Sequence, residues 1–211
     1  MTRLLNRMVA DKLIRVHKIG QNDPLYFFLP TTKAPTVFSH AHERACADVY
    51  IAYESTGKLK VWNVPENFED YESYVNAGVR PDRISIIDEK IVFWEIDKGT
   101  ESYQGVSDKI TNYLNLWKKQ GYRTFNVVFA TKDYFRYRNG NKILRQSAKT
   151  RARGILLDLI PFKRASQFIV GQLNQIIADP LGAVFASPLA PDRLISLADL
   201  DVKPELPKIP A

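Results

Sequence analysis

Two apolar runs on either side of a short polar turn constrain the fold of this chain more than any other feature. Residues 83–88 (RISIID) and 90–97 (KIVFWEID) are rich in β-branched and aromatic side chains, and only Asp88 and Glu89 separate their apolar cores. Such a tight connection joins neighbouring antiparallel strands. We therefore expect two adjacent antiparallel strands here, with Asp82 at the start of the first and Glu95 near the end of the second.

The segments around this pair predict the rest of the layer. Residues 58–64 (KLKVWNV) indicate a preceding strand and residues 123–131 (RTFNVVFAT) a buried following strand. Between them, residues 102–121 show apolar side chains at helical spacing, including Val106, Ile110 and Trp117, and Gly121 ends the helix. Three strands, a helix and a fourth strand predict an α/β (α+β) domain, in which helices cover the faces of a central mixed sheet.

The remaining predicted elements complete three parts of the chain. Helices are expected over residues 40–56, 142–160 and 165–178, and a final short strand over residues 183–187. The parts are a small N-terminal module at 1–30, the α/β domain at 38–200 and a loose, Pro-rich tail at 201–211. Residues 31–36 form the linker between the first two.

The N-terminal module has the pattern of half a winged helix. Residues 3–10 predict a short helix, and residues 13–20 and 24–30 predict two strands of a hairpin. In a winged helix, such a helix enters the major groove and the hairpin is the wing. Arg3 and Arg7 would then face the groove, and Lys18 would lie on the wing. The two helices that normally come first are missing, so either the module is truncated or it is incomplete. An ordinary packing unit of one helix and two strands is the alternative.

Composition excludes several classes of protein. No stretch approaches the ~20 apolar residues that a membrane-spanning helix needs, and Arg3, Arg7 and Asp11 interrupt the N-terminus as no secretory signal would. A single cysteine, Cys46, allows neither an internal disulfide nor a Cys-rich zinc site. We therefore expect a cytoplasmic protein without a membrane partner.

The net charge is +7, and ten of the basic residues fall within about a sixth of the chain. Its basic residues are Lys132, Arg136, Arg138, Lys142, Arg145, Lys149, Arg151, Arg153, Lys163 and Arg164. Tyr134, Phe135 and Tyr137 are interleaved among them. Because cationic side chains neutralise phosphates and aromatic rings stack on bases, this pattern favours DNA binding. We expect the contacts to come from Arg136, Arg138, Arg145, Lys149, Arg151 and Arg153. A solvated amphipathic face is the alternative.

Carboxylates cluster near the predicted strand pair. Glu95 and Asp97 share one face of their strand by its period of two, and Asp82 begins the neighbouring strand. Carboxylates on adjacent strands can converge on a hard cation such as Mg²⁺. The alternative is that Asp82 caps a turn while Glu95 and Asp97 face solvent. The next helix adds Lys109 and Tyr113, whose spacing places them on one helix face.

These motifs together resemble the replication-relaxation family. The resemblance rests on RPD at 80–82, EIDKGTE at 95–101 and the Lys109-to-Tyr113 spacing. His42 with Asp48, Trp62 with Glu66, and the segment RLLNRMVADKLIRV at 3–16 add further matches. Members of this family pair a winged helix with an α/β domain and are encoded on plasmids and other mobile elements. The resemblance covers residues 3–131.

The family in turn resembles PD-(D/E)XK nucleases, which implies a nuclease-like core. Asp82 and Glu95 would then hold Mg²⁺, or Mn²⁺ as its substitute. Asp97 stands where these nucleases carry a lysine, and Lys109 on the next helix would replace that lysine, with Tyr113 beside it. Asp97 would add an outer ligand or orient a metal-bound water.

Three functions follow from this reading. The first is a DNA-binding protein of a mobile element, acting in replication, relaxation or transfer. The second is an active Mg²⁺-dependent endonuclease or nickase. The third is a scaffold whose missing N-terminal helices come from a partner. In all three cases DNA is an expected partner, and a second copy of the chain or the replication and transfer proteins of the mobile element are further candidates.

Overall fold

The structure, a computed structural model, describes residues 7–13, 15–17, 26–28, 37–67, 71–120, 125–138, 141–161 and 167–200. The chain divides into two compact units, Met1–Arg44 and Ala45–Ala211. The predictions for Arg3, Lys18, the linker at 31–36 and the tail at 201–211 concern residues outside the described ranges.

The first unit contains a paired hairpin. Strands β1 (Arg15–His17) and β2 (Tyr26–Phe28) are antiparallel, with Arg15 opposite Phe28, so the predicted pairing of these two segments is confirmed. Residues 7–10 are helical, and the exposed Arg7 lies 3.8 Å from the carboxylate of Asp11. Helix and hairpin agree with the expected local elements, while their use as a winged helix stays a prediction.

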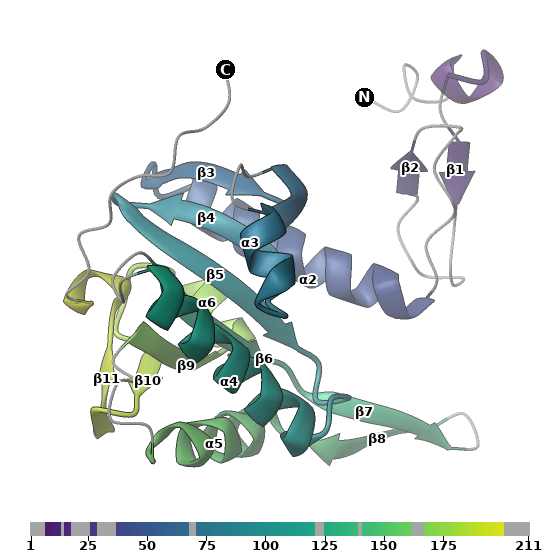
Figure 1. The fold of residues 1–211 in the computed structure, drawn as a ribbon. Coiled ribbons are helices and arrows are strands. Elements are labelled where there is room, and N and C mark those ends of the chain that lie inside the picture. Colours follow the sequence, from purple (N-terminus) through teal and green to yellow (C-terminus); the bar gives the residue numbers. More distant parts are fainter. Residues whose placement is uncertain are drawn as a thin grey trace. The chain divides into compact units, whose positions relative to one another are not determined.

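The second unit is built on a seven-stranded sheet with the order β11-β10-β9-β6-β5-β4-β3 (Figure 1). Its strands are β3 (Leu59–Asn63), β4 (Arg83–Ile87), β5 (Lys90–Asp97), β6 (Asn126–Thr131), β9 (Phe168–Gln172), β10 (Phe185–Ser187) and β11 (Ala190–Ile195). The central strands β5, β6 and β9 are parallel, and the flanking strands on both sides are antiparallel. The predicted mixed sheet is confirmed.

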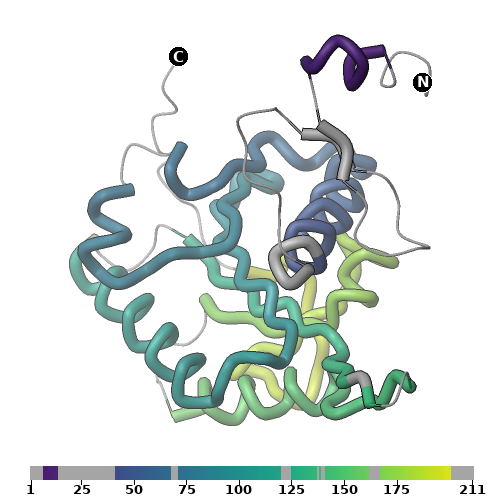
Figure 2. The backbone as a smooth tube through the Cα atoms, turned by 90° about the vertical axis from the view of Figure 1, so that its right-hand side faces the viewer, coloured from purple at the N-terminus to yellow at the C-terminus, as the bar shows by residue number. Residues whose placement is uncertain are grey.

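Helices cover both faces of this sheet. The helices are α2 (Val37–Glu54), α3 (Tyr71–Asn76), α4 (Tyr103–Gln120), α5 (Ala148–Leu159) and α6 (Leu173–Ala178), with short 3-10 turns at Pro65–Asn67 and Leu197–Asp199. One core cluster, which includes Phe93, joins α3, α4 and α5 to one face of the sheet. The other cluster, which includes Trp94, joins α6 and the second half of α2 to the opposite face. Because β5 is buried on both faces, its apolar run is nearly continuous. Figure 2 shows α4 lying beside α5.

The tight turn predicted between β4 and β5 is present. Asp88 and Glu89 have φ angles of 47° and 68°, and Ile87 pairs directly with Lys90. Two central residues with positive φ match the twist of a two-residue hairpin. Lys58 stabilises the turn, because its carbonyl accepts a hydrogen bond from the Asp88 amide and its ammonium lies 3.4 Å from the Asp88 carboxylate.

The predicted helix over residues 142–160 is wrong in its first third. Residues Asn141–Gln146 form strand β8, which pairs antiparallel with β7 (Tyr134–Arg138), and the helix begins only at Ala148. In the sequence, Asn139 and Gly140 come between the two strands, and this residue pair is the one most typical of a two-residue hairpin. Ser147 starts the helix by accepting a hydrogen bond from the Thr150 amide at 3.1 Å.

Two further differences lie near the C-terminus. Residues 165–178 were predicted as one helix, but Phe168–Gln172 form β9 in the centre of the sheet and only Leu173–Ala178 are helical. The strand β9 pairs with β6, from which it is distant in sequence, so local periodicity could not identify it. The predicted strand at 183–187 is confirmed as β10, and its partner β11 was not predicted. No helix in the described ranges has both the length and the apolarity to cross a membrane.

Candidate functional site

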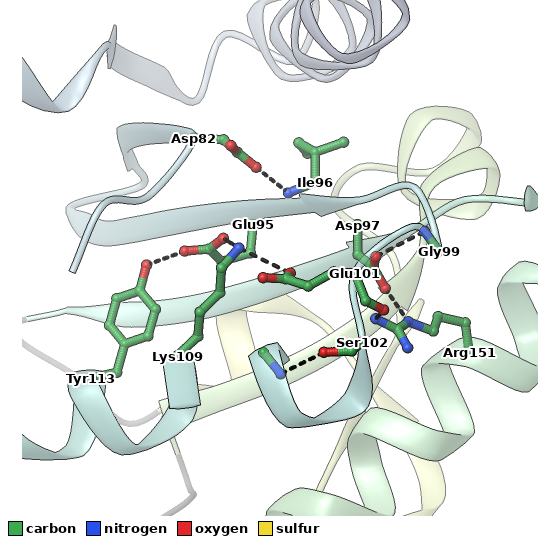
Figure 3. Close-up of polar contacts among 11 residues, drawn as sticks. Asp82, Glu95, Ile96, Asp97, Gly99, Glu101, Ser102, Lys109, Tyr113 and Arg151 are labelled. Atoms are coloured by element: carbon green, nitrogen blue, oxygen red, sulfur yellow. Dashed lines mark hydrogen bonds and ion pairs between the residues drawn. The ribbon is translucent and has the colours of Figure 1, made fainter. Parts of the chain in front are cut away.

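A buried carboxylate lies at the junction of β5 and α4 (Figure 3). The side chain of Glu95 is only 4% exposed, yet both its oxygens have donors. The hydroxyl of Tyr113 donates to Oε1 at 2.6 Å, and the ammonium of Lys109 donates to Oε2 at 2.8 Å. Lys109 also lies 3.1 Å from Glu101, so its ammonium bridges two carboxylates. Sequence reasoning brought Glu95, Lys109 and Tyr113 together correctly and gave Glu101 no role, although Glu101 ends the EIDKGTE motif.

Regular backbone periods produce this cluster. Along β5, Phe93 packs in the core beneath α4, and Glu95 points the same way two residues later. Along α4, Lys109 and Tyr113 are four residues apart and therefore project from one side of the helix toward β5. Ile110 fixes the register of the helix on the sheet because it is fully buried.

Burial controls the electrostatics of the cluster. It raises the pKa of Glu95 to about 7 from an ordinary value of 4.5, and the nearby charge of Asp82 adds to the rise while Lys109 opposes it. Burial lowers the pKa of Lys109, but the charge of Glu95 and its hydrogen bond outweigh this and leave the pKa raised. Burial, together with the charge of Glu95, also raises the pKa of Tyr113 well above its ordinary range. Tyr113 is therefore a hydrogen-bond donor at neutral pH, and Lys109 is a cation.

The carboxylate of Asp82 is held by the backbone of β5. Its Oδ2 accepts a hydrogen bond from the Ile96 amide at 2.7 Å, and its own amide donates to the Trp94 carbonyl at 2.8 Å. The antiparallel pairing of β4 with β5 thus continues through Asp82. The two carboxylates expected to be neighbours, Asp82 and Glu95, are close enough for the charge of one to act on the other.

Asp97 and Arg151 form a buried ion pair, which neither residue was predicted to make. The Arg151 guanidinium donates to Oδ2 of Asp97 and, at 2.9 Å, to the Glu101 carbonyl, and Oδ1 of Asp97 accepts from the Gly99 amide at 2.8 Å. Arg151 is 1% exposed and Asp97 is 7% exposed. The guanidinium also lies 4.6 Å from the centre of the Tyr103 ring.

This pair changes two of the sequence-based roles. Arg151 was expected to contact DNA, but its burial leaves it no surface from which to reach a phosphate. Asp97 was expected near a cation as an outer ligand, but its two oxygens are held by Arg151 and Gly99. Both residues instead fix the loop between β5 and α4, which carries Glu101.

The residues offer no preformed site for the predicted Mg²⁺. Both oxygens of Glu95 are bonded, and one oxygen of Asp82 is bonded to Ile96. In the part of the chain that the structure describes, no three His, Cys, Asp or Glu side chains gather as a metal-binding group. The ammonium of Lys109 lies beside Glu95 where a bound cation would stand, so Lys109 would have to move before the ion could bind.

The second candidate site is the hairpin of β7 and β8, which we call the basic arm. It forms a separate two-stranded sheet and extends past the ends of β5 and β6 in Figure 1. Arg136, Arg138 and Arg145 are exposed on it and, with Ile143, line a pocket of about 380 Å³. Lys149 and Arg153 are exposed on the adjoining helix α5. The structure thus places five of the six residues expected to contact DNA in this region on the surface.

The fold and these two sites define a mixed α/β protein that has a buried acid–base cluster at the end of the central strand β5 and an exposed basic arm. The family model described as Replication-relaxation matches residues 28–129. This segment of the chain is therefore similar to the replication-relaxation family, as the motifs in the sequence indicated. The match includes Asp82, Glu95 and Lys109, and it ends before the basic arm. No curated protein and no solved structure matches the chain.

Proposed function

We propose that this chain is a DNA-binding protein of a mobile element that acts in replication, relaxation or transfer, with the basic arm and α5 as its DNA-binding surface. The observation that carries the proposal is the group of five exposed cations: Arg136, Arg138, Arg145, Lys149 and Arg153. The family adds support, because its name refers to replication and relaxation. In this proposal the protein works in the cytoplasm, with DNA, other replication or transfer proteins, or a second copy of the chain as partners.

The arrangement of the cations suits a phosphate backbone. Three arginines share one pocket on the arm, and the two cations of α5 follow in the first helical turns after it. Each phosphate that they neutralise releases condensed counterions, so binding must weaken as salt rises. Arginine also forms paired hydrogen bonds with phosphate oxygens, which lysine cannot do.

The test is the salt dependence of binding to supercoiled plasmid and to linear duplex DNA. We expect the triple variant Arg145→Ala, Lys149→Ala, Arg153→Ala to reduce the slope of log K against log salt by about 2 to 3, because each phosphate contact contributes ~0.9. Lys60→Ala is the matched control: Lys60 is an exposed lysine on the edge strand β3, paired with Glu89 at 3.3 Å. Equal slopes for the triple variant and the parent chain would overturn the proposal.

Metal-dependent nicking of DNA is a second candidate, and one observation favours it. A buried carboxylate, a lysine and a tyrosine meet at the end of a central strand, with Asp82 close by. Asp82 and Glu95 are the residues that would hold Mg²⁺, and Lys109 would have to leave Glu95 for the ion to bind.

A plasmid-nicking assay with Mg²⁺ or Mn²⁺ separates the two candidates. If the chain nicks DNA, Asp82→Ala should abolish the activity, and Lys109→Ala should slow it by about 10²–10³-fold, as is typical for groups that stabilise developing charge. Both variants should keep the salt-dependent binding of the parent chain. Nicking that survives Asp82→Ala would exclude this site as its source.

A further inference from the structure

The two faces of the basic arm differ in chemistry. Arg136 lies opposite Ile143 in the register, and Arg138 and Arg145 follow on the same face by the period of two. The other face carries Phe135, opposite Leu144, and the Lys142 ammonium lies 3.9 Å from the centre of the Phe135 ring. One face of the hairpin is therefore an arginine face, and the other is an apolar face.

We infer that the basic arm is a two-stranded ribbon that enters the major groove of duplex DNA with its arginine face toward the base edges, where it reads guanine. This inference rests on the proposed DNA-binding function and extends it from phosphate contact to base recognition. It assigns Arg136 and Arg138 to the bases and Lys149 and Arg153 to the phosphates.

The dimensions of the arm fit this groove. The major groove is ~12 Å wide and admits a two-stranded ribbon, whereas the minor groove, at ~6 Å, does not. The five residues of β7 span roughly 17 Å at ~3.4 Å per residue. Arg136 and Arg138 stand roughly 7 Å apart along the strand, which is about two base-pair steps.

The side chains of the arginine face match the pattern of the groove. A guanidinium donates two parallel hydrogen bonds to O6 and N7 of guanine, which is the commonest specific contact in protein–DNA complexes. Ile143, which is 42% exposed between the arginines, offers an apolar surface to a thymine methyl group. A surface used only for phosphates has no need of an exposed isoleucine at its centre.

Single-stranded nucleic acid fits this face less well. Proteins that bind single strands stack the bases on exposed aromatic rings. Phe135 lies on the apolar face, and Lys142 covers its ring. Among the side chains that the structure describes, three arginines and an isoleucine line the pocket of the arginine face, and no aromatic ring does.

The root of the arm is fixed to the domain, so the arginine face has a defined direction. Asp133, just before β7, accepts a hydrogen bond from the Ala148 amide at 2.7 Å. Gln146, at the end of β8, donates to the Tyr103 hydroxyl at 3.1 Å. Gly99 approaches Tyr134 so closely that a Cβ atom at Gly99 would lie 2.9 Å from that of Tyr134. A ribbon held in this way enters a groove without first being ordered.

The experiment starts from a duplex that the full chain selects from a random-sequence pool. We expect the selected sites to share guanines, and replacement of these by 7-deazaguanine, which lacks the N7 acceptor, to weaken binding roughly tenfold or more per guanine. Arg136→Lys and Arg138→Lys keep the charge but lose the paired donors. The two lysine variants should bind the selected and the random duplex almost equally, and they should keep the salt slope of the parent chain. By contrast, Lys149→Ala and Arg153→Ala should weaken binding to both duplexes by the same factor. Lys142→Ala, on the apolar face, is the matched control.

The outcomes separate the inference from the function beneath it. If the chain binds duplex DNA with an arm-dependent salt slope but selects no sequence, or if 7-deazaguanine has no effect, base reading by the arm is overturned while DNA binding stands. Base reading in the major groove is also overturned if a minor-groove ligand displaces the chain from DNA and 7-deazaguanine has no effect on binding. If the chain binds no DNA, the proposed function itself fails. Because the arm arginines are exposed, unchanged thermal unfolding of their variants will show that the fold is intact.

Discussion

Arg145 and Arg151 lie close together in the sequence and have opposite surroundings. Arg145 is exposed on the basic arm, whereas Arg151 is 1% exposed and bonded to Asp97. In the sequence they belong to one basic run, and both were expected to contact DNA. The comparison teaches that the charge of a run predicts a partner for the run as a whole, while burial decides for each residue whether the partner is outside or inside the protein.

The same contrast separates the two candidate sites. In the buried cluster, Glu95 is held by Lys109 and Tyr113, so its charges are compensated within the protein. On the basic arm, three arginines share a pocket, and no carboxylate lines it among the described residues. A substitution in the buried cluster should destabilise the fold, because it leaves one partner buried without the other. A substitution on the exposed cationic surface should leave the fold stable and weaken the binding of the ligand. Each of the following predictions tests this division.

The largest effect is expected at Arg151. Arg151→Met leaves Asp97 buried without its cation and should destabilise the protein by about 3–5 kcal/mol, whereas Arg145→Met should stay within ~0.5 kcal/mol. Urea unfolding followed by circular dichroism measures both. The double variant Asp97→Asn, Arg151→Met should recover part of the loss. Equal stability of Arg145→Met and Arg151→Met would break the comparison.

The next effect concerns pH. Because burial raises the pKa of Glu95 from 4.5 to about 7, the folded state holds this proton more tightly than the unfolded state does. The resulting stability is complete below pH ~4.5, is lost as pH rises through about 7 and amounts to at most ~3 kcal/mol. Relative to Glu95→Gln, which cannot titrate, the parent chain should lose stability across this window. Parallel pH profiles of the two proteins would contradict the assignment.

A smaller loss is expected from Tyr113→Phe. The variant keeps the ring in the core but removes the hydroxyl that donates to Glu95 at 2.6 Å, which should destabilise the protein by about 1–3 kcal/mol. Tyr50→Phe, at a tyrosine that is 41% exposed, is the control and should change little. Thermal unfolding compares the two variants, and an equal shift in both would show that Glu95 does not need this donor.

The smallest effect on stability sharpens the comparison from the other side. Arg136→Ala and Arg138→Ala should alter the free energy of unfolding by less than ~0.5 kcal/mol, because both side chains are exposed. The same two variants should clearly weaken binding to duplex DNA. A large loss of stability would mean that the arm arginines serve the fold rather than a ligand.

Local pattern alone determined the strand pair around Asp88 and Glu89, the helix that follows it, and the shared direction of Lys109 and Tyr113. Each depends on a period or a turn that extends over a few residues, and side chains on neighbouring elements then meet almost of necessity. The sequence also carried motifs that resemble the replication-relaxation family, and the model of that family matches residues 28–129, which contain most of these motifs.

Only the tertiary structure decided which charges are compensated inside the protein. Arg151 reaches Asp97 across 54 residues of sequence, and the strand β9 joins β6 by pairing that no local period reveals. The basic run was divided in the same way, since the pairing of β7 with β8 exposed Arg145 and the packing of α5 buried Arg151. The physical reason is that burial depends on contacts between segments distant along the chain, whereas charge and periodicity are properties of each segment by itself.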